Sequence, residues 1–569
     1  MTSLSAGRAG AAEPDLIDRL PSLAALTHAR ACAALLLLAL VLFLPGQIGL
    51  QPMDRDEPRF AQASKQMLET GDLVDIRFQA EARHKKPVGI YWLQAASVAA
   101  GEALGVPQAR TEIALYRIPS LVGACAAVLL AYWGALAFLN RPDALLAAAL
   151  FGACLMLSAE ARLAKTDALL TACTVASFGA LARAWLSRGS FVPLPRGALL
   201  AFWGGLALGI LVKGPMVPLF VGLPALILSI LVRDAYWLRR LRPGLGVALV
   251  ALAVAPWFLA IAWKSGGAFF AEAVGQDMLG KVGTAKEKHW GPPGAYALAF
   301  FGTFWPGAAF AALAIPFAWR ARGEDAVALL ISAILPAWLI FEGVPTKLPH
   351  YVLPLMPMVA ILTVLALRRG ALDPARTGAT ALAFLVVAIP LGLAVGLAIA
   401  GWQLDRQIPW AALPALAGAV GLALAAWFAF RAARPERALV LGILASLLVS
   451  PALFGLGQRE IPALKVSPRL AAIRDALPCA NPRVASLGYR EPSLVFLIGT
   501  DLATPPTGRE ASDFLHAGGC RLVFVEARQA AGFAAAEAGR PAARQVGTVS
   551  GFNINGGRRV GLTAYAVVP

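Results

Sequence analysis

The chain has 569 residues, of which 58% are hydrophobic and only 15% are charged. This balance is far too apolar for an ordinary soluble protein, and it indicates a polytopic membrane protein. The net charge of +17 comes from 50 Lys and Arg residues against 33 acids. Because the arginines lie in short clusters between apolar runs, and not in one basic block, we expect contacts with membrane lipids and no nucleic-acid partner.

Residues 1 to about 27 lack the layout of a signal peptide, and we expect them to form a cytoplasmic lead-in. The first apolar run, near 31–50, predicts a retained transmembrane helix. From 51 to 111 the chain is not apolar enough to cross a bilayer again. The mixed polar and apolar character of 58–69 and 91–104 predicts two helices that lie along the membrane interface in this first external loop.

The apolar runs that follow this loop predict, together with the first run, about thirteen transmembrane helices. With thirteen spans, all the arginine clusters fall on one side of the membrane. The positive-inside rule assigns that side to the cytoplasm, which puts the carboxyl terminus outside. The later runs lie near 112–138, 143–159, 168–186, 198–213, 215–232, 245–263, 295–319, 327–343, 352–367, 379–402, 410–430 and 439–457, and the arginine clusters lie at 183–196, 233–242, 320–322, 368–376 and 431–437.

After residue 457 the chain turns polar, and short β-like runs alternate with helical stretches. This alternation predicts a small α/β domain outside the membrane. We therefore divide the chain into a membrane domain, 1–457, and a C-terminal domain, 458–569. The predicted strands are 483–487, 494–498, 521–526 and 560–568, and the predicted helices are 468–476 and 510–517.

The cysteines fall into two groups. Cys479 and Cys520 lie in the polar C-terminal region, where an oxidising compartment would allow a disulfide; two unpaired thiols are the alternative. The others lie in or beside apolar runs and are expected to pack as small hydrophobes. They are Cys32, Cys125, Cys154 and Cys173.

The stretch 53–60 puts three acids and two arginines directly after the first span. Ionisable groups near hydrocarbon are costly and tend to be functional. If Pro58 begins a helix, Asp56 and Arg59 share one helical face, where a carboxylate can act in catalysis while a guanidinium binds an anion such as phosphate. The alternative is that these charges only mark the helix end and face water.

Other external cations could also meet a phosphate. Lys85 and Lys86 form a cationic cluster before the second interfacial helix, and plain attraction of lipid headgroups is the alternative. Asp167 opens a span, where a helix-capping aspartate is the alternative. Lys213 divides two apolar runs, where it could cap the preceding helix or reach a lipid phosphate.

The prolines at 345–357 predict an irregular segment, which membrane depth tolerates only where protein or a water-filled cavity covers it. Lys347 and Tyr351 are therefore expected to line a cavity. His289 stands among lysines and makes a poor metal site. The absence of a Walker lysine loop and of a serine elbow argues against an ATP-driven pump and a serine hydrolase. The sequence requires no cofactor, and a divalent metal is unsupported.

The sequence resembles the bacterial lipid A 4-amino-4-deoxy-L-arabinose transferases, which belong to the polyprenyl-phosphate-dependent integral membrane glycosyltransferases. The acid pair after the first helix is shared across that superfamily, so it points to the fold class more strongly than to the sugar. The resemblance rests on Asp-Glu-Pro-Arg-Phe-Ala at 56–61, Gly71-Asp72, Lys86-Pro87 with Tyr91-Trp92, Asp167, Lys213-Gly214 and Lys347-Leu348-Pro349-His350-Tyr351.

This resemblance implies a polytopic α-helical protein of the GT-C glycosyltransferase fold, with about thirteen transmembrane helices, interfacial periplasmic helices and a small C-terminal α/β periplasmic domain. It implies an undecaprenyl phosphate-linked aminoarabinose donor and a lipid A acceptor. It also implies a monomer in the bacterial inner membrane, with the active site facing the periplasm, and resistance to polymyxin as the outcome.

By the same resemblance, Asp56 matches the essential acid of the first loop and Asp167 a second acid. The chain departs from some relatives in carrying Lys85 where they have an acid, which weakens any carried-over metal contact. The donor phosphate would be held by Arg59, Lys86, Lys213 and Tyr351, and the cavity would be lined by Glu57, Lys85, His289, Lys347 and His350.

Two other functions remain open from the sequence. One is the transfer of a different polyprenyl-linked sugar to a protein or to another glycan. The other is a lipid transporter, for which charges in mid-membrane and paired, broken half-repeats would be typical. The polar residues of this chain instead crowd one face, and no paired half-repeats are found.

Overall fold

The structure is a computed structural model that describes residues 16–53, 55–280, 290–479 and 481–567. Each of the thirteen predicted spans coincides with one helix or with two consecutive helices. Within the described residues, nine helices are long and apolar enough to cross a membrane, and three shorter apolar helices accompany them. The remaining predicted span, 143–159, forms the pair α6 and α7. The chain is therefore a multi-pass membrane protein.

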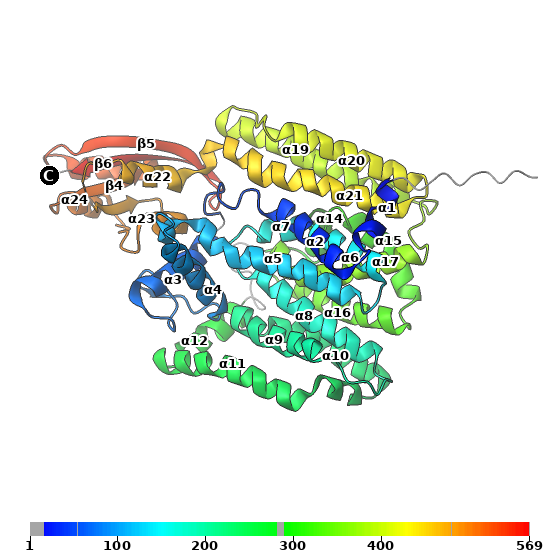
Figure 1. Ribbon diagram of the computed structural model, residues 1–569. Coiled ribbons are helices and arrows are strands. Elements are labelled where there is room, and N and C mark those ends of the chain that lie inside the picture. Colours follow the sequence, from blue (N-terminus) through cyan, green and yellow to red (C-terminus); the bar gives the residue numbers. More distant parts are fainter. Residues whose placement is uncertain (1–15, 54, 281–289, 480, 568–569) are drawn as a thin grey trace, which may run out of the picture.

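The membrane helices lie side by side, with α1 at one end of the bundle and the C-terminal sheet beyond the other end (Figure 1). This arrangement agrees with an odd number of crossings. The elements of the bundle are α1 (Leu16–Ala24), α2 (His28–Phe43), α5 (Ile113–Ala135), α6 (Arg141–Gly152), α7 (Leu155–Glu160), α8 (Asp167–Leu186), α9 (Arg196–Lys213), α10 (Met216–Val232), η2 (Tyr236–Leu241), α11 (Pro243–Lys264), α12 (Ala268–Phe270), η3 (Ala271–Leu279), α14 (Ala295–Thr303), α15 (Ala308–Arg320), α16 (Asp325–Gly343), η4 (Pro349–Leu355), α17 (Met356–Arg368), α18 (Ala379–Ala383), α19 (Leu385–Asp405), α20 (Leu413–Arg431) and α21 (Pro435–Ser450).

The two helices of the first external loop are α3 (Asp56–Thr70) and α4 (Gly89–Ala103), close to the predicted segments. α3 ends at Gly71, whose φ of +73° lies in the left-handed region that glycine adopts without strain. The helix packs on α4 and on a helix of the C-terminal domain, α23 (Pro492–Ile498). Most of α3 is buried, so protein encloses this helix and it does not lie open on the membrane surface.

The arginine clusters meet at the end of the bundle away from the sheet. Arg188, after α8, pairs at 2.8 Å with Asp325 at the start of α16. Arg369, after α17, pairs at 3.0 Å with Glu324, and Arg368 pairs at 2.7 Å with Glu436 of α21. These pairs connect three of the five arginine clusters with one another or with the acids that follow the cluster at 320–322, so these clusters lie at one end of the bundle, as the charge distribution along the sequence predicts.

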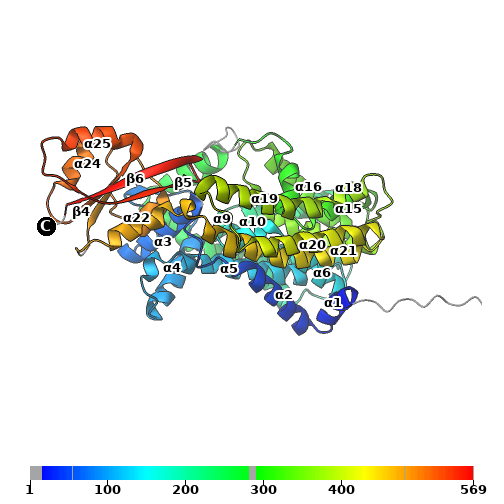
Figure 2. The ribbon, with the colours of Figure 1, turned by 90° about the horizontal axis from the view of Figure 1, so that it is seen from above.

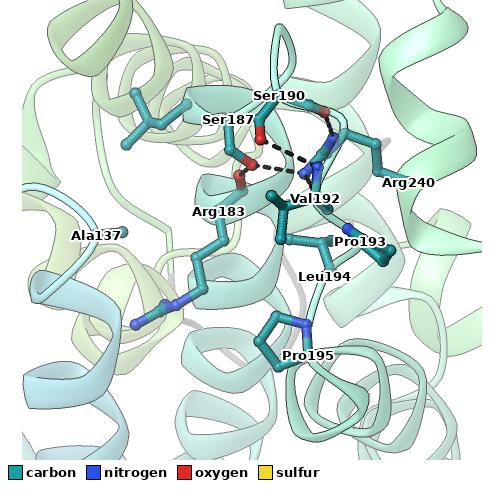
Figure 3. A pocket seen from close by; sticks show the side chains of 10 residues that line it. Ala137, Arg183, Ser187, Ser190, Val192, Pro193, Leu194, Pro195 and Arg240 are labelled. Carbon is teal, nitrogen blue, oxygen red and sulfur yellow. Dashed lines mark hydrogen bonds between the residues drawn. The ribbon is translucent and has the colours of Figure 1, made fainter.

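A cavity of about 320 Å³ opens at this arginine-rich end, between the end of α8, the loop that leads to α9, and η2 (Figure 3). Arg240 of η2 ties the loop, because its guanidinium donates hydrogen bonds to the Ser190 carbonyl and to Ser187 Oγ. Arg183 extends away from that loop toward α5, where it donates to the Trp133 carbonyl and stacks on the Trp133 ring. Both guanidiniums thus hold the protein's own chain in place.

The C-terminal domain contains a four-stranded sheet with the order β3-β4-β6-β5. β3 and β4 are parallel, and the other neighbours are antiparallel. The turned view shows α24 and α25 together on one side of the strands (Figure 2). The elements are α22 (Val466–Asp475), β3 (Arg483–Leu487), α23, α24 (Gly508–Leu515), β4 (Arg521–Glu526), α25 (Ala530–Glu537), β5 (Arg544–Asn553) and β6 (Arg558–Val567).

Alternate residues of β4 supply the two cores of this domain. Leu522 and Phe524 pack in a cluster with residues of α22 and α23, whereas Val523 and Val525 pack with residues of α24 and α25. Successive side chains of a strand point to opposite faces, so a central strand covered on both faces reads as a continuous apolar run.

Three predicted strands form, but the prediction of a strand at 494–498 is wrong. These residues belong to α23, which begins at Pro492, a residue favoured in the first turn of a helix. A short apolar run does not distinguish a strand from a buried helix by its periodicity. β5 was not predicted, because its apolar positions are diluted by Gly547, Ser550 and Gly551.

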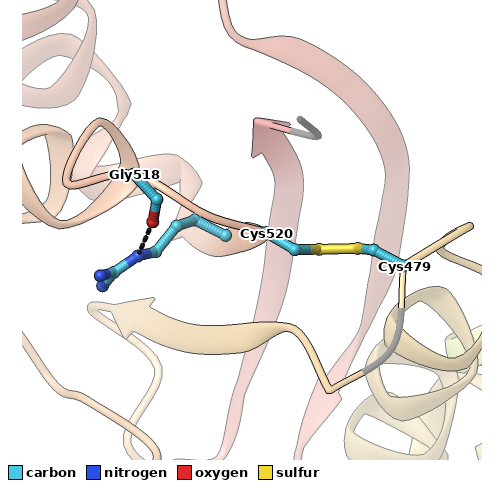
Figure 4. The surroundings of a disulfide bond; sticks show 4 residues. Cys479, Gly518 and Cys520 are labelled. Carbon is cyan, nitrogen blue, oxygen red and sulfur yellow. Dashed lines mark hydrogen bonds between the residues drawn. A yellow bond between two sulfur atoms is a disulfide. The ribbon is translucent and has the colours of Figure 1, made fainter.

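Cys479 and Cys520 form a disulfide, with a Cα–Cα distance of 6.4 Å (Figure 4). Of the two alternatives that the sequence leaves open, the structure thus has the bond. It joins the segment before β3 to the residue before β4, across a sequence separation of 41. The remaining cysteines are unbridged and at least half-buried, as predicted for small hydrophobic side chains.

Candidate functional site

Asp56 is the first residue of α3 and lies between two arginines. Its Oδ1 atom is 3.9 Å from Arg59 Nη1 and 4.0 Å from Arg83 Nη2. The Asp56 side chain is 46% exposed, whereas that of Arg83 is only 7% exposed. The pairing with Arg59 is the one that the helical spacing predicts, but Arg83 comes from the turn before α4 and was not singled out from the sequence.

The charge of Asp56 follows from its neighbours. Burial alone would raise the pKa of this carboxyl, but the positive charges of Arg83, Lys165 and Arg59, and His350 as well, hold the pKa below its ordinary value. Asp56 is therefore an anion near neutral pH. It can stabilise positive charge or hold a cation, but it carries no proton to donate.

A second group of charged side chains is buried beside the first. Asp167 Oδ1 lies 2.5 Å from Lys213 Nζ, and Glu160 Oε1 lies 3.3 Å from Lys165 Nζ. His350 stands between the two acids: its Nδ1 is 3.6 Å from Glu160 Oε1 and its Nε2 is 3.8 Å from Asp167 Oδ2. Together with Asp56 and its two arginines, these side chains form one group of charges at the end of the bundle next to the C-terminal sheet.

Local chain geometry brings this second group together. Glu160 is the last residue of the short helix α7, and Asp167 is the first residue of α8. The turn of six residues between them brings both acids to the same end of the bundle. Lys213 ends α9, where Gly214 has a φ of +61°, a conformation that favours glycine. The proline-rich η4 supplies His350, together with Tyr351, whose ring centre is 5.3 Å from Lys213 Nζ.

Burial also affects the protonation of Glu160, the last residue of α7, which lies beyond the predicted span 143–159. Its burial, reinforced by the nearby Asp167 carboxylate, raises the pKa of Glu160 to about 7 in spite of the Lys165 ammonium. Glu160 thus changes its charge close to neutral pH. The charges at 160–167 were placed in one loop from the sequence, but Glu160 and Lys165 were given no role, because nothing in the local sequence shows that Glu160 meets His350.

Glu57, adjacent to Asp56, has a structural role. Glu57 and Arg117 of α5 are both fully buried and are joined by hydrogen bonds of 2.7 and 3.0 Å. The Glu57 carboxylate also accepts from the backbone N–H groups of Met53 and Ala164. Arg117 donates to backbone carbonyls as well, at Gln47, Leu50 and Gln51. Both Glu57 oxygens are occupied, so Glu57 anchors the loop.

Lys347 binds the carboxyl-terminal end of α16. Its ammonium donates to the carbonyls of Phe341, Glu342 and Val344, at 3.3, 2.7 and 3.0 Å. These are carbonyls of the last helical turn, which a lysine can satisfy. The structure therefore brings Lys347 to the helix end, whereas His350 and Tyr351 of the same predicted segment reach the charged group.

The other predicted residues are placed as follows. Lys86 is partly exposed and Lys85 is exposed, both in the turn before α4. Asp54 and His289 lie outside the described residues. Asp72, from the resemblance motif, pairs at 2.5 Å with Lys264 of α11 and so ties the first loop to that helix. Across the described parts of the chain, no group of three or more His, Cys, Asp or Glu residues is arranged to hold a metal ion.

No family model matches this sequence. The undecaprenyl phosphate-alpha-4-amino-4-deoxy-L-arabinose arabinosyl transferase of Erwinia tasmaniensis is 29% identical over 367 residues, which cover 61% of this chain and 62% of that protein. The protein of the same name from Pseudomonas paraeruginosa is 30% identical over 322 residues, 54% of each chain. These alignments span less than two thirds of the relatives' length.

Solved structures match over more of the chain. The crystal structure of ArnT from Cupriavidus metallidurans bound to undecaprenyl phosphate has a TM-score of 0.68 and 18% identity, covering 94% of this chain and 97% of that one. The archaeal oligosaccharyltransferase AglB from Archaeoglobus fulgidus has a TM-score of 0.50 and 11% identity, covering 87% of this chain and 69% of that one. The chain therefore has the GT-C-type fold of these membrane glycosyltransferases, and the relatives that its sequence matches are arabinosyl transferases.

Proposed function

We propose that this chain transfers 4-amino-4-deoxy-L-arabinose from undecaprenyl phosphate to a phosphate group of lipid A at the periplasmic face of a bacterial inner membrane. The names of its sequence relatives and its fold support this activity. The observation that carries the proposal is the half-exposed Asp56 carboxylate, held between Arg59 and Arg83. Such a transfer would give resistance to polymyxin and related cationic peptides.

The donor phosphate is the leaving group, so cations that stabilise its developing charge lower the barrier. Arg83 suits this task. Its guanidinium lies over the Phe60 ring at 4.9 Å, and its buried Nε has no hydrogen-bond partner among the residues that the structure describes. A phosphate oxygen would satisfy this donor. Arg59 and Lys86 add positive charge from α3 and from the turn before α4.

Asp56 would act on the sugar. A carboxylate next to the anomeric carbon stabilises the positive charge that develops there during glycosyl transfer, and the lowered pKa of Asp56 keeps it ionised for this role. A phosphate acceptor is already largely ionised near neutral pH. The acceptor therefore needs a general base less than a hydroxyl would.

Two features support the periplasmic orientation. Disulfides form and persist in oxidising compartments, and the C-terminal domain, which holds the Cys479–Cys520 bond, lies at the same end of the bundle as α3, which carries Asp56 (Figure 1). The arginine clusters lie at the other end, where the positive-inside rule expects the cytoplasm.

The test is mass spectrometry of lipid A from a polymyxin-sensitive strain that lacks its own transferase. We expect an added aminoarabinose mass with the wild type and none with Asp56→Asn at equal protein levels. Asp325→Asn removes an acid at the arginine-rich end and should behave as the wild type. Transfer by Asp56→Asn at the wild-type level would refute the role of Asp56.

Unmodified lipid A with the wild type, at a confirmed protein level, would refute the proposed donor and acceptor. A glycan and glycoprotein analysis of the same cells would then identify transfer of another polyprenyl-linked sugar.

A further inference from the structure

Two buried polar atoms of the site lack a partner among the described residues, and they differ in character. Arg83 Nε is a hydrogen-bond donor, and Glu160 Oε2 is an acceptor. An unpaired buried polar atom loses its hydrogen bonds to water without gaining new ones, so each one in a folded protein requires an explanation. A ligand with both an anionic and a cationic group would satisfy both atoms.

The two oxygens of Glu160 have different surroundings. Oε1 faces Lys165 Nζ at 3.3 Å and His350 Nδ1 at 3.6 Å. Oε2 faces no donor in the described parts of the chain. The Glu160 side chain is only 3% exposed, so bulk solvent does not serve this oxygen.

Arg83 contacts Asp56 directly, and Glu160 is linked to Asp56 through shared neighbours. Arg83 is 4.0 Å from Asp56. Lys165 and His350 contact Glu160, and their charges also act on Asp56. A sugar whose anomeric carbon lies at Asp56 would therefore direct its phosphate toward Arg83, while the opposite edge of the ring faces the Glu160 side.

We propose that Glu160 forms a subsite for the protonated amine of the donor sugar, with Oε2 accepting a hydrogen bond from the ammonium group. This inference rests on the proposed function, because it assumes an aminosugar donor. The amine of that sugar is on carbon 4, across the ring from the anomeric carbon that carries the phosphate. Glu160 is then a specificity-determining residue, because a sugar with a hydroxyl at that position brings no positive charge to a buried carboxylate.

The charges around Glu160 agree with such a ligand. Its neighbours are the cations Lys165 and Lys213, the acid Asp167 and the imidazole of His350. Without a ligand, Glu160 holds a proton for part of the time near neutral pH, because burial raises its pKa to about 7. An arriving ammonium group favours the ionised carboxylate, so binding of the amine donor releases a proton from Glu160 to solvent.

The test compares two synthetic donors in detergent-solubilised full-length protein: undecaprenyl phosphate-aminoarabinose and undecaprenyl phosphate-arabinose, which has a hydroxyl in place of the amine. We expect the wild type to favour the amine donor by about 10- to 100-fold in kcat/KM, the size of one charge-assisted hydrogen bond. Glu160→Gln should reduce this preference to about threefold or less, mainly through a higher KM for the amine donor. Glu160→Asp, which keeps the charge, should retain part of it.

Glu342→Gln is the matched control, because Glu342 is a partly buried acid that also faces a lysine, Lys347, at 3.6 Å. Its donor preference should equal that of the wild type. Wild-type preference in Glu160→Gln would overturn the amine subsite and leave the proposed function standing. A wild type inactive with both donors would instead refute the proposed function.

Calorimetry of wild-type protein keeps the inference testable if Glu160→Gln does not fold. Donor binding is measured in two buffers of different ionisation enthalpy, which reports the protons released. We expect release with the amine donor and none with the arabinose donor near pH 7. Equal release with both donors would overturn the subsite.

Discussion

The charged side chains at the two ends of the helix bundle differ in their burial and in their partners. At the arginine-rich end, side chains such as Arg188 and Arg369 form ion pairs that are open to solvent, and Arg240 of η2 donates to the backbone of the loop between α8 and α9. At the end next to the C-terminal sheet, acids and cations are buried together, and both a donor, Arg83 Nε, and an acceptor, Glu160 Oε2, lack a partner in the described chain. At the arginine-rich end a donor, Arg240 Nε, also lacks one.

This difference indicates which charges serve orientation and which serve chemistry. Exposed ion pairs contribute little to stability and orient the chain through their number and sign. A buried charged group with an unpaired polar atom lowers the stability of the fold. Such groups are typical of sites where a bound ligand supplies the missing hydrogen-bond partner. The predictions below test this contrast, from the largest expected effect to the smallest.

The buried pair Glu57–Arg117 should carry the largest effect. Replacing Arg117 by Met leaves the fully buried Glu57 carboxylate without its main partner, so we expect a loss of about 3–5 kcal/mol in the free energy of unfolding. Thermal unfolding of purified protein measures it. The double variant Glu57→Leu with Arg117→Met should recover part of this loss, and a single variant as stable as the wild type would contradict the anchoring role.

Removal of the disulfide should have the second largest effect. Replacing Cys479 and Cys520 by Ser opens a cross-link over a sequence separation of 41, which is worth about 4 kcal/mol in the chain-entropy account. We expect faster limited proteolysis of the C-terminal domain, while transfer persists at low temperature because the bond touches none of the site's side chains. Cys125→Ser is the control and should leave the proteolysis rate unchanged.

Arg83→Gln should lower transfer by about 10- to 100-fold in kcat/KM, the loss of one charge-assisted hydrogen bond to the donor phosphate. Arg77 offers a matched control in the same loop. It is exposed and pairs with Asp75 at 3.0 Å, away from the charged site. Arg77→Gln should therefore transfer at the wild-type rate, and equal losses in both variants would argue for a general effect on the loop.

Glu160 should give the protein a pH-dependent stability. Its folded-state pKa of about 7 lies above its ordinary value, so the folded form binds a proton that the unfolded chain releases between about pH 4.5 and 7. The free energy of unfolding therefore falls as pH rises through that window, by at most about 1.4 kcal/mol per pH unit. Melting curves of Glu160→Gln should lack this slope, and parallel pH profiles of variant and wild type would contradict the raised pKa.

The smallest effect belongs to the arginine-rich end. Arg322 is exposed, stacks on Trp319 and donates to its carbonyl. Arg322→Gln should change the unfolding free energy by less than about 0.5 kcal/mol and leave transfer unaltered. A large loss of activity would show that charges at this end also serve the chemistry, and would break the contrast between the two ends.

Much of the fold could be predicted from the sequence, because apolar length and arginine position are properties of single segments. All thirteen predicted spans have helical counterparts. The strands 483–487 and 521–526 match β3 and β4 to the residue. The segment 494–498 was misassigned, because the contacts that make it a helix come from α3 and α22, far away in the chain.

The site was predicted only where its members are close in the sequence. Asp56 and Arg59 are three residues apart, and their pairing follows from the helical repeat. Arg117 lies inside an apolar run and meets Glu57 across 60 residues of sequence, and His350 meets Glu160 only because η4 folds back onto α7. One sequence without spatial information contains no signal for such distant pairs.

Asp56 and Glu57 show that the sequence also does not distinguish the roles of two adjacent residues. The two acids are adjacent and chemically alike, yet one is half exposed between arginines and the other is completely buried in a structural network. Neighbouring helical positions point about 100° apart. The residue type therefore predicts an acid at the membrane edge, and only the helix rotation decides which of the two can meet a substrate.

The redox state of Cys479 and Cys520 also reports whether the C-terminal domain of a given molecule has been translocated. In the periplasmic orientation that we propose, a chain whose C-terminal domain is still on the reducing side of the membrane keeps both thiols, and it gains the cross-link only after translocation. The ratio of thiol-labelled to unlabelled chains during a pulse-chase thus measures how quickly this last segment is exported. Disulfide formation thus reports the time at which the C-terminal domain crosses the membrane.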